Sequence, residues 1–417
     1  MAENPNLGKS SQRFHMSRSV IVLVGGQFLS QIGNVALIVA AYWYASSRFG
    51  AASLGFLGLA AGLGGMISLL SGPFIDRWNS RHAMIAVDLL RALIMAALTV
   101  LILRHQLSLV RLTIGLFLLE AIGSLFSPAE MRLIPTLVQR DQLPSVNAVN
   151  RAAMSLAQVI SWGVSGALLA VIGVAGLFLT NALSFVTSAI SLMALQVGGA
   201  ERKEPGAQQA PFRSGNLRKE WVEGLNAVWQ NGLLKRVLPA ALLANLSFTA
   251  WNVLSSAWVH KVLGADAFSY GALGMAILLG GIGGAIVSPK MLDWISKPKA
   301  IAVSLATAGF ALTALSRVPV LWPDLMLVFV IGVALGMLNT LVSVTLQRDV
   351  PRALIGRVAG VVFGLVSVTI PLGAIVSGEL SRIWPLSTLF TVAGLITASS
   401  CVLLMGTHEN AVPAEAE

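Results

Sequence analysis

The chain has 417 residues, of which 56% are hydrophobic and 11% are charged, and its formal net charge is +10 at pH 7. A soluble domain carries about 25% charged residues, so this composition excludes an ordinary soluble protein and predicts a membrane protein. The positive charges are spread over short polar connections, which favours contact with anionic lipid over binding of nucleic acid.

Twelve apolar stretches follow one another, centred near residues 32, 62, 93, 119, 157, 185, 248, 279, 307, 333, 367 and 395. Each is about 20 residues long, the length that crosses ~30 Å of hydrocarbon as a helix. The first follows a basic start, as in a signal peptide, but it is too long for one, and we expect it to be retained. The predicted fold class is therefore an all-α membrane protein with twelve transmembrane helices.

Basic residues favour one side of this predicted membrane protein. If the N-terminus is cytoplasmic, most of the 28 Lys and Arg lie in the connections and tails on that side, including Arg77, Arg81, Arg132, Arg140, Lys290, Lys297 and Arg348. Fewer lie in the outer connections: Arg48, Arg104, Arg111, Lys261, Arg317 and Arg382. This distribution follows the positive-inside rule. We expect a multi-pass protein of the cytoplasmic (inner) membrane with both termini in the cytoplasm.

The two halves of the chain repeat each other. Gln139-Arg140-Asp141, after the fourth stretch, recurs as Gln347-Arg348-Asp349 after the tenth. Proteins with parallel repeats of this kind bind substrate near the membrane midplane, between the halves. We expect two pseudo-symmetric six-helix bundles, over 1–200 and 236–406, with a cytoplasmic linker at 201–235 and a cytoplasmic tail at 407–417.

Four motifs in the first half of the chain are informative together: Gly72-x-x-x-Asp76-Arg77, Ala86-x-Asp88-Leu-Leu-Arg91-Ala, Phe126-Ser-Pro128-Ala129-Glu130 and Asn181-Ala-x-Ser184-Phe185. They resemble the major facilitator superfamily, and in particular its branch of enterobactin and other siderophore exporters and macrolide efflux pumps. The resemblance implies the major facilitator fold and transport of a small molecule by alternating access. Antiporters of this superfamily often carry Gly-Pro-x-x-Gly-Gly in the fifth span, where this chain has 161–166 without a proline.

Polar residues with the spacing i, i+4, i+7 occur in both the first and the seventh stretch, so each set shares one helical face. Such residues can serve only as hydrogen-bonding contacts between helices, but their recurrence favours a central cavity, which these two spans line throughout the superfamily. Two mid-span tryptophans could stack on a bulky substrate or simply pack. The predicted cavity residues are Gln27, Gln31, Asn34, Glu120, Trp162, Asn245, Thr249, Trp251 and Asn252.

Glu120 lies in the middle of the fourth stretch, and no basic residue lies one turn away on the same helix. An ionisable residue inside a span is costly and is a functional candidate by default. Because burial in a low dielectric disfavours a charged carboxyl, we expect Glu120 to bind the driving proton or the substrate. The alternative is a neutral, hydrogen-bonded carboxyl with a structural role only.

Another set of charged residues is predicted to form a cytoplasmic gate: Asp76, Arg77, Arg81, Asp88, Arg91, Glu130 and Arg151. Asp88 and Arg91 are three residues apart near the cytoplasmic end of the third stretch, and we expect an ion pair between them. Glu379, at the outer end of the eleventh stretch, is either a solvated end residue or part of an outer gate.

The sequence shows no enzyme constellation, no metal-binding spacing among its five histidines and no phosphate loop of the form G-x-x-x-x-G-K-[S/T]. We therefore expect no enzyme activity, no cofactor and no metal. The predicted function is export of a bulky organic solute, siderophore or drug-like, in exchange for protons. The expected partners are that solute, the proton and membrane lipid, and we expect a monomer. The alternatives are a lysophospholipid or lipid flippase and a non-transporting membrane sensor.

Overall fold

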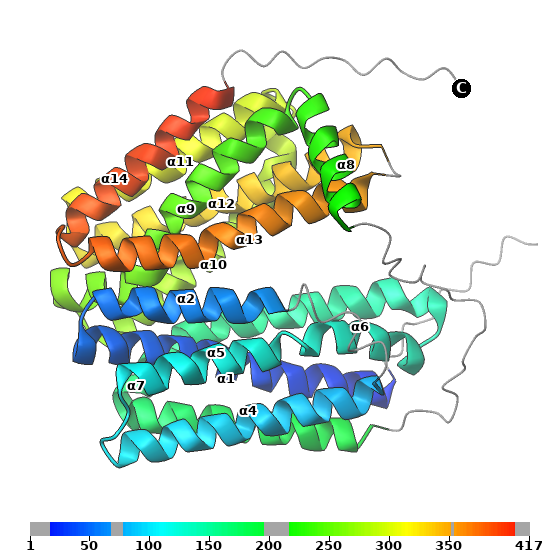
Figure 1. Ribbon diagram of the computed structural model, residues 1–417, viewed down its shortest axis with the longest axis vertical. Coiled ribbons are helices and arrows are strands. Elements are labelled where there is room, and N and C mark those ends of the chain that lie inside the picture. The colour runs from blue at the N-terminus through cyan, green and yellow to red at the C-terminus, as the bar shows by residue number, and fades with distance from the viewer. Residues whose placement is uncertain (1–16, 68–77, 196–216, 352–353, 405–417) are drawn as a thin grey trace, which may run out of the picture.

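The computed structural model describes residues 17–67, 78–195, 217–351 and 354–404, and within these ranges the regular elements are all helices (Figure 1). Ten segments are long and apolar enough to cross a membrane. One of them, α7 (Leu143–Met193), contains two spans, because its backbone leaves the helical conformation at Gly173, with φ of 66°. The shorter apolar helix α2 (Ala52–Met66) is a further span, so the described residues contain twelve spans, which confirms the predicted fold class.

The first half of the chain comprises α1 (Arg18–Phe49), α2, α4 (Ser80–Leu103), α5 (Leu109–Gly123), α6 (Phe126–Leu137) and α7. The second half comprises α9 (Leu234–Ala257), the π-helical turn η3 (Trp258–Val262), α10 (Ala267–Met291), α11 (Lys297–Arg317), α12 (Leu321–Asp349), α13 (Ile355–Leu380) and α14 (Leu386–Ser399). Figure 1 shows the two halves as two stacked layers of helices.

Short connections gather at one end of the molecule, on the left of Figure 1. We call this the turn end; its connections lie at residues 50–51, 104–108, 173, 263–266, 318–320 and 381–385. Gly173 reverses the chain there without a separate loop, at a φ that a side chain would disfavour. The opposite end, with connections at 138–142, 231–233 and 292–296, is called the linker end.

The two halves contact each other along their turn-end parts, where α2 packs on α13 and α7 on α10. A Cβ built on Gly55 of α2 would lie 2.8 Å from Cα of Gly378 in α13, so the two backbones are nearly in contact. The Ser256 hydroxyl donates a 3.3 Å hydrogen bond to the Tyr42 carbonyl, which joins α9 to α1. Small residues thus allow the halves to meet closely at this end.

The predicted linker, 201–235, contains a helix that the sequence analysis did not assign. This helix, α8 (Leu217–Gln230), packs on α13, and Glu223 forms an ion pair with Arg357. Asn231 then accepts a 2.9 Å hydrogen bond from the backbone N–H of Leu234 at the start of α9. The described part of the linker therefore packs against the second half. Residues 201–216 and the tail at 407–417 lie outside the described ranges.

Candidate substrate cavity

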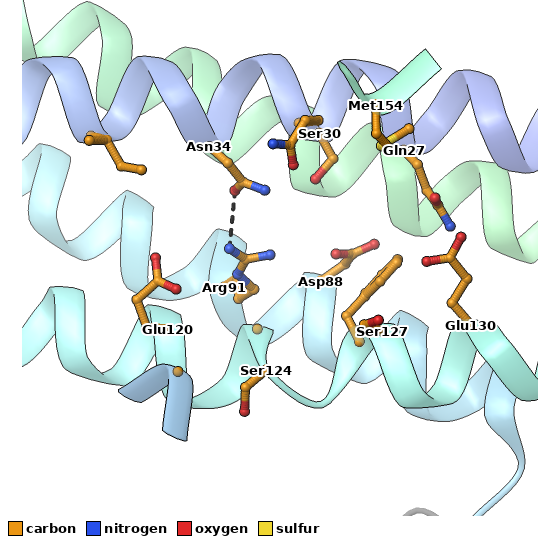
Figure 2. Close-up of a pocket in the computed structure, with 15 residues that line it drawn as sticks. Gln27, Ser30, Asn34, Asp88, Arg91, Glu120, Ser124, Ser127, Glu130 and Met154 are labelled. Carbon is orange, nitrogen blue, oxygen red and sulfur yellow. Dashed lines mark hydrogen bonds between the residues drawn. The ribbon is translucent and has the colours of Figure 1, made fainter. Parts of the chain in front are cut away.

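A cavity of about 590 Å³ lies among the helices of the first half, between α1, α4, α5, α6 and α7 (Figure 2). Its volume is within the range of about 300–1,000 Å³ that is usual for small-molecule sites. We call it the charged cavity, because Asp88, Arg91, Glu120 and Glu130 line it. Three carboxyl groups and one guanidinium suit it to binding a proton or a cationic group.

The polar face of α1 forms one wall of the charged cavity. Gln27, Gln31 and Asn34 all line it, as their spacing predicted, and Ile38 continues the same face one turn further along. Gly33, on the next face, lies so close to the Asn181 side chain of α7 that a Cβ there would overlap it at 2.3 Å. Because Gly33 has no side chain, α1 packs tightly on α7 through that face. The polar face of α1 is therefore directed toward the cavity.

Arg91 reaches across the cavity to α1, where its Nη2 donates a 3.0 Å hydrogen bond to Oδ1 of Asn34 (Figure 2). The guanidinium also lies 4.2 Å from the ring centroid of Phe185, a cation–π contact. Gly123 makes room for it, since a Cβ there would lie 2.9 Å from Cζ of Arg91. Arg91 is at the middle of α4, not near its end as expected.

Asp88 does not form the expected ion pair with Arg91 in this conformation. It is fully buried, with Ser188 of α7 and Arg91 as its polar neighbours, and neither carboxylate oxygen has a hydrogen bond within the described ranges. The physical reason is that the Arg91 side chain extends to Asn34 and Phe185 instead of lying back along its own helix.

Glu120 projects from α5 into the same cavity (Figure 2). Sequence spacing offers it no basic partner on its own helix, but the fold brings in Arg91 of α4, which interacts with it electrostatically. Among the described residues no ion pair within 4.0 Å joins the two, since Arg91 donates to Asn34 instead. The helix that carries Glu120 ends three residues later, and Ser124 and Ser127 add hydroxyl groups to the lining.

Toward the linker end, Glu130 accepts a 2.7 Å hydrogen bond from Nδ2 of Asn150, and Gln27 points toward it (Figure 2). The other predicted gate residues lie elsewhere. Nε of Arg81 donates a 2.8 Å hydrogen bond to the Leu192 carbonyl at the end of α7, and Arg151 is exposed. Asp76 and Arg77 lie outside the described residues.

A smaller cavity, of about 220 Å³, lies between the two halves, closer to the turn end. We call it the aromatic chamber, because Tyr42, Trp162, Trp251 and Tyr270 line it. Asn252 and Ser255 are its polar lining residues. Both predicted cavity tryptophans and one predicted asparagine, Asn252, therefore lie here, apart from the charged groups.

Two residues predicted to line the cavity are absent from the lining of both. Thr249 is 2% exposed, donates a 2.8 Å hydrogen bond to the Asn245 carbonyl and packs against Gly373 of α13. Asn245 is half-buried. The repeated spacing was thus a correct sign of a shared helical face, but in the second half that face is turned partly toward α13.

The sequence analysis missed several lining residues, among them Ser30, Ile38, Tyr42 and Tyr270. Helical spacing from Gln27 and Asn34 could have identified the first three, since they lie on the same side of α1. Tyr270 had no such signal, because its position depends on how the two halves meet. Glu379 forms a 3.1 Å ion pair with Arg382 at the turn end, where both side chains are well exposed.

Comparisons with known proteins agree with this architecture. Residues 23–374 match the Major Facilitator Superfamily. The chain is 27% identical over 358 residues to the multidrug efflux pump Tap of Mycolicibacterium fortuitum, covering 84% of this chain and 86% of that protein. It is 23% identical over 371 residues to macrolide efflux protein A of Streptococcus pyogenes, with coverage of 84% and 86%.

Solved structures at lower identity share the fold. The nucleoside transporter NupG has a TM-score of 0.72 at 14% identity and covers 93% of this chain and 97% of its own. A bacterial homologue of the iron transporter ferroportin, in an inward-facing state, has a TM-score of 0.69 at 16% identity, with coverage of 94% and 100%. At these identities the likeness concerns the arrangement of helices alone.

Proposed function

Because the chain belongs to the Major Facilitator Superfamily, we propose that this multi-pass membrane transporter exports drug-like organic solutes across the cytoplasmic membrane in exchange for protons. Two of its relatives are a multidrug efflux pump and a macrolide efflux protein. The observation that carries the proposal is the charged cavity, in which Glu120 and Arg91 face each other at the centre of a membrane-spanning bundle.

We infer that the linker end faces the cytoplasm. Basic residues are concentrated there, for example Arg81, Lys297 and Arg348, in keeping with the positive-inside rule. The charged cavity extends from Ile38 at mid-height toward this end, where Gln27 and Glu130 line it. The halves meet at the turn end, so the conformation corresponds to the inward-facing state in which a cytoplasmic solute is taken up.

The proposed coupling depends on competition for Glu120. When Glu120 is protonated, Arg91 has no counter-charge there and keeps its hydrogen bond to Asn34. When Glu120 loses its proton to the cytoplasm, its carboxylate can hold a cationic group of the solute. Solute and proton then occupy the same carboxyl in alternation, which is what exchange requires. A siderophore with several negative charges fits three lining carboxyl groups less well than a cationic or zwitterionic drug.

The test is ethidium transport in proteoliposomes with and without an imposed pH gradient. We expect the gradient to drive ethidium transport by the wild type, and Glu120→Gln to lose that stimulation while keeping its fold. Glu379→Gln is the matched control, because that carboxyl is exposed at the turn end and paired with Arg382. Equal stimulation of the wild type and Glu120→Gln would exclude Glu120 as the coupling site.

A further inference from the structure

The walls of the aromatic chamber are held in place by packing. The Trp162 ring lies against Gly274 so closely that a Cβ there would overlap it, and it meets the Tyr270 ring edge-on at 5.6 Å. Trp251 is 4% exposed and packs on Phe390 at 5.4 Å between ring centroids. Rings fixed in this way can bind a flat solute without first losing conformational freedom.

The chamber is closed toward the turn end by aromatic side chains from both halves. Trp43 of α1 stacks on Tyr270 at 6.3 Å and meets His260 edge-on at 5.3 Å. On the side formed by α1, the chamber adjoins the charged cavity. The two spaces share one lining residue, Ile38, among those described.

Ile38 lies between a polar and an aromatic environment on the same helical face. Asn34, which holds Arg91, is one turn before it, and Tyr42, in the chamber, is one turn after it. The chamber alone is smaller than the roughly 300–1,000 Å³ of a typical drug site, whereas the charged cavity is within that range. The chamber is therefore large enough for part of a solute and not for all of it.

We propose that the aromatic chamber is a second binding compartment, which takes a planar aromatic ring system of the solute past Ile38 while the solute's cationic group stays at Glu120. Ile38 is then a residue that determines specificity, because its side chain sets the width of the passage between the two compartments. This proposal rests on the proposed function for the identity of the charged site. It adds the substrate class: cations that carry a flat aromatic ring.

The experiment compares two cations, proflavine, which is planar and aromatic, and tetrapropylammonium, which is not. Binding to purified full-length protein in detergent is measured by equilibrium dialysis. Ile38→Trp narrows the passage, and Tyr42→Leu removes a ring that lines the chamber and not the charged cavity. Ile21→Trp is the matched control, because Ile21 is on the same helix and 55% exposed.

We expect both Ile38→Trp and Tyr42→Leu to weaken proflavine binding about tenfold, the size of one or two lost aromatic contacts. Tetrapropylammonium binding should stay within about twofold in both, and Ile21→Trp should change neither. Equal loss of both cations in Ile38→Trp would overturn the proposal, because Ile38 would then obstruct the charged cavity itself. Unchanged proflavine binding in both variants, or wild-type protein that does not prefer proflavine, would overturn it too.

Since this assay has no gradient, it separates the two proposals. Failure of proton coupling would appear in the transport experiment on Glu120→Gln and leave the preference for proflavine in place. Failure of the aromatic compartment would remove that preference and leave gradient-driven transport intact.

Discussion

Nε1 of the Trp258 indole donates a 2.8 Å hydrogen bond to Oδ2 of Asp324, and both side chains are completely buried. The bond connects the π-helical turn η3 to the first turn of α12, and the Trp258 ring also packs on Phe390 at 5.2 Å. Oδ1 of Asp324 has no hydrogen bond within the described ranges. The indole is thus the hydrogen-bond donor that holds a buried carboxyl at the turn end of the second half.

The contributions of Trp258 and Asp324 to stability should depend on each other. Trp258→Phe leaves the Asp324 carboxyl without its donor, and Asp324→Leu leaves a buried indole N–H without an acceptor; each should cost about 1–3 kcal/mol. The double variant should cost less than the sum of the two, because no orphaned polar group remains. Thermal unfolding in detergent measures all four proteins. Additive losses would show that the two groups do not depend on each other.

The hydrogen bond between Arg91 and Asn34 should be sensitive to charge at Asn34. Asn34→Asp places a carboxylate where Arg91 now donates to a neutral amide at 3.0 Å. A charged acceptor binds the guanidinium more strongly, so Arg91 should no longer be available to balance the charge of Glu120 in the interval after that carboxyl has released its proton and before it binds the solute. We expect gradient-driven ethidium transport to fall about tenfold, a coupling change of about 1.4 kcal/mol.

Asn34→Ala is the comparison for that variant. It removes the acceptor without adding charge, and its loss of transport should be smaller. A larger loss in Asn34→Ala than in Asn34→Asp would show that the hydrogen bond itself, and not the release of Arg91, is required.

Asp266 caps α10 just outside the membrane-spanning segment, and its Oδ1 accepts from the backbone N–H of Ser269 at 2.9 Å and from its hydroxyl at 2.8 Å. These bonds, the backbone bond first, lower the pKa of Asp266 below its ordinary value of 3.8. Because the pKa of Asp266 is lower in the folded state, the charged cap contributes its full stabilisation above the ordinary value of 3.8. The contribution is lost as the pH falls through the folded-state pKa.

We therefore expect Asp266→Ala to lower stability by about 1 kcal/mol at pH 7. Asp266→Asn should retain most of the cap, since asparagine also accepts at this position. The measurement is the melting temperature of the three proteins at neutral pH and well below pH 3.8. The gap between wild type and Asp266→Ala should narrow in acid, and a constant gap would rule out the charged cap as its cause.

The glycines that bring the halves together should control which end of the transporter is open. A Cβ on Gly378 would lie 2.6 Å from Cα of Gly55, so Gly378→Ala pushes α13 away from α2 at the turn end. This should favour the state closed at the linker end. Labelling of a cysteine placed at Ser127, in a protein whose single native cysteine is replaced by Cys401→Ser, reports access to the charged cavity.

We expect a membrane-impermeant maleimide to label Ser127→Cys more slowly in the Gly378→Ala background. Gly283→Ala is the matched control, because a Cβ there has no neighbour within 4 Å. Faster or unchanged labelling in Gly378→Ala would mean that this contact does not keep the turn end closed.

The sequence by itself determined the twelve spans and the polar face of α1. Both are local properties: a span is recognised by its apolar length, and the inward position of Gln27, Gln31 and Asn34 follows from 3.6 residues per turn. Local periodicity predicts which residues share a face of a helix, and for α1 there was only one polar face to turn inward.

Only the tertiary structure decided which faces meet. Spacing of three residues suggested that Arg91 would pair with Asp88, but the fold brings Asn34 and Phe185 within reach of its guanidinium. In the seventh span, spacing identified a shared face for Asn245, Thr249 and Asn252, but the fold turns Thr249 toward Gly373 of α13. Helix rotation and register are set by packing against neighbours far away in the chain, and a sequence pattern within one helix carries no information about those neighbours.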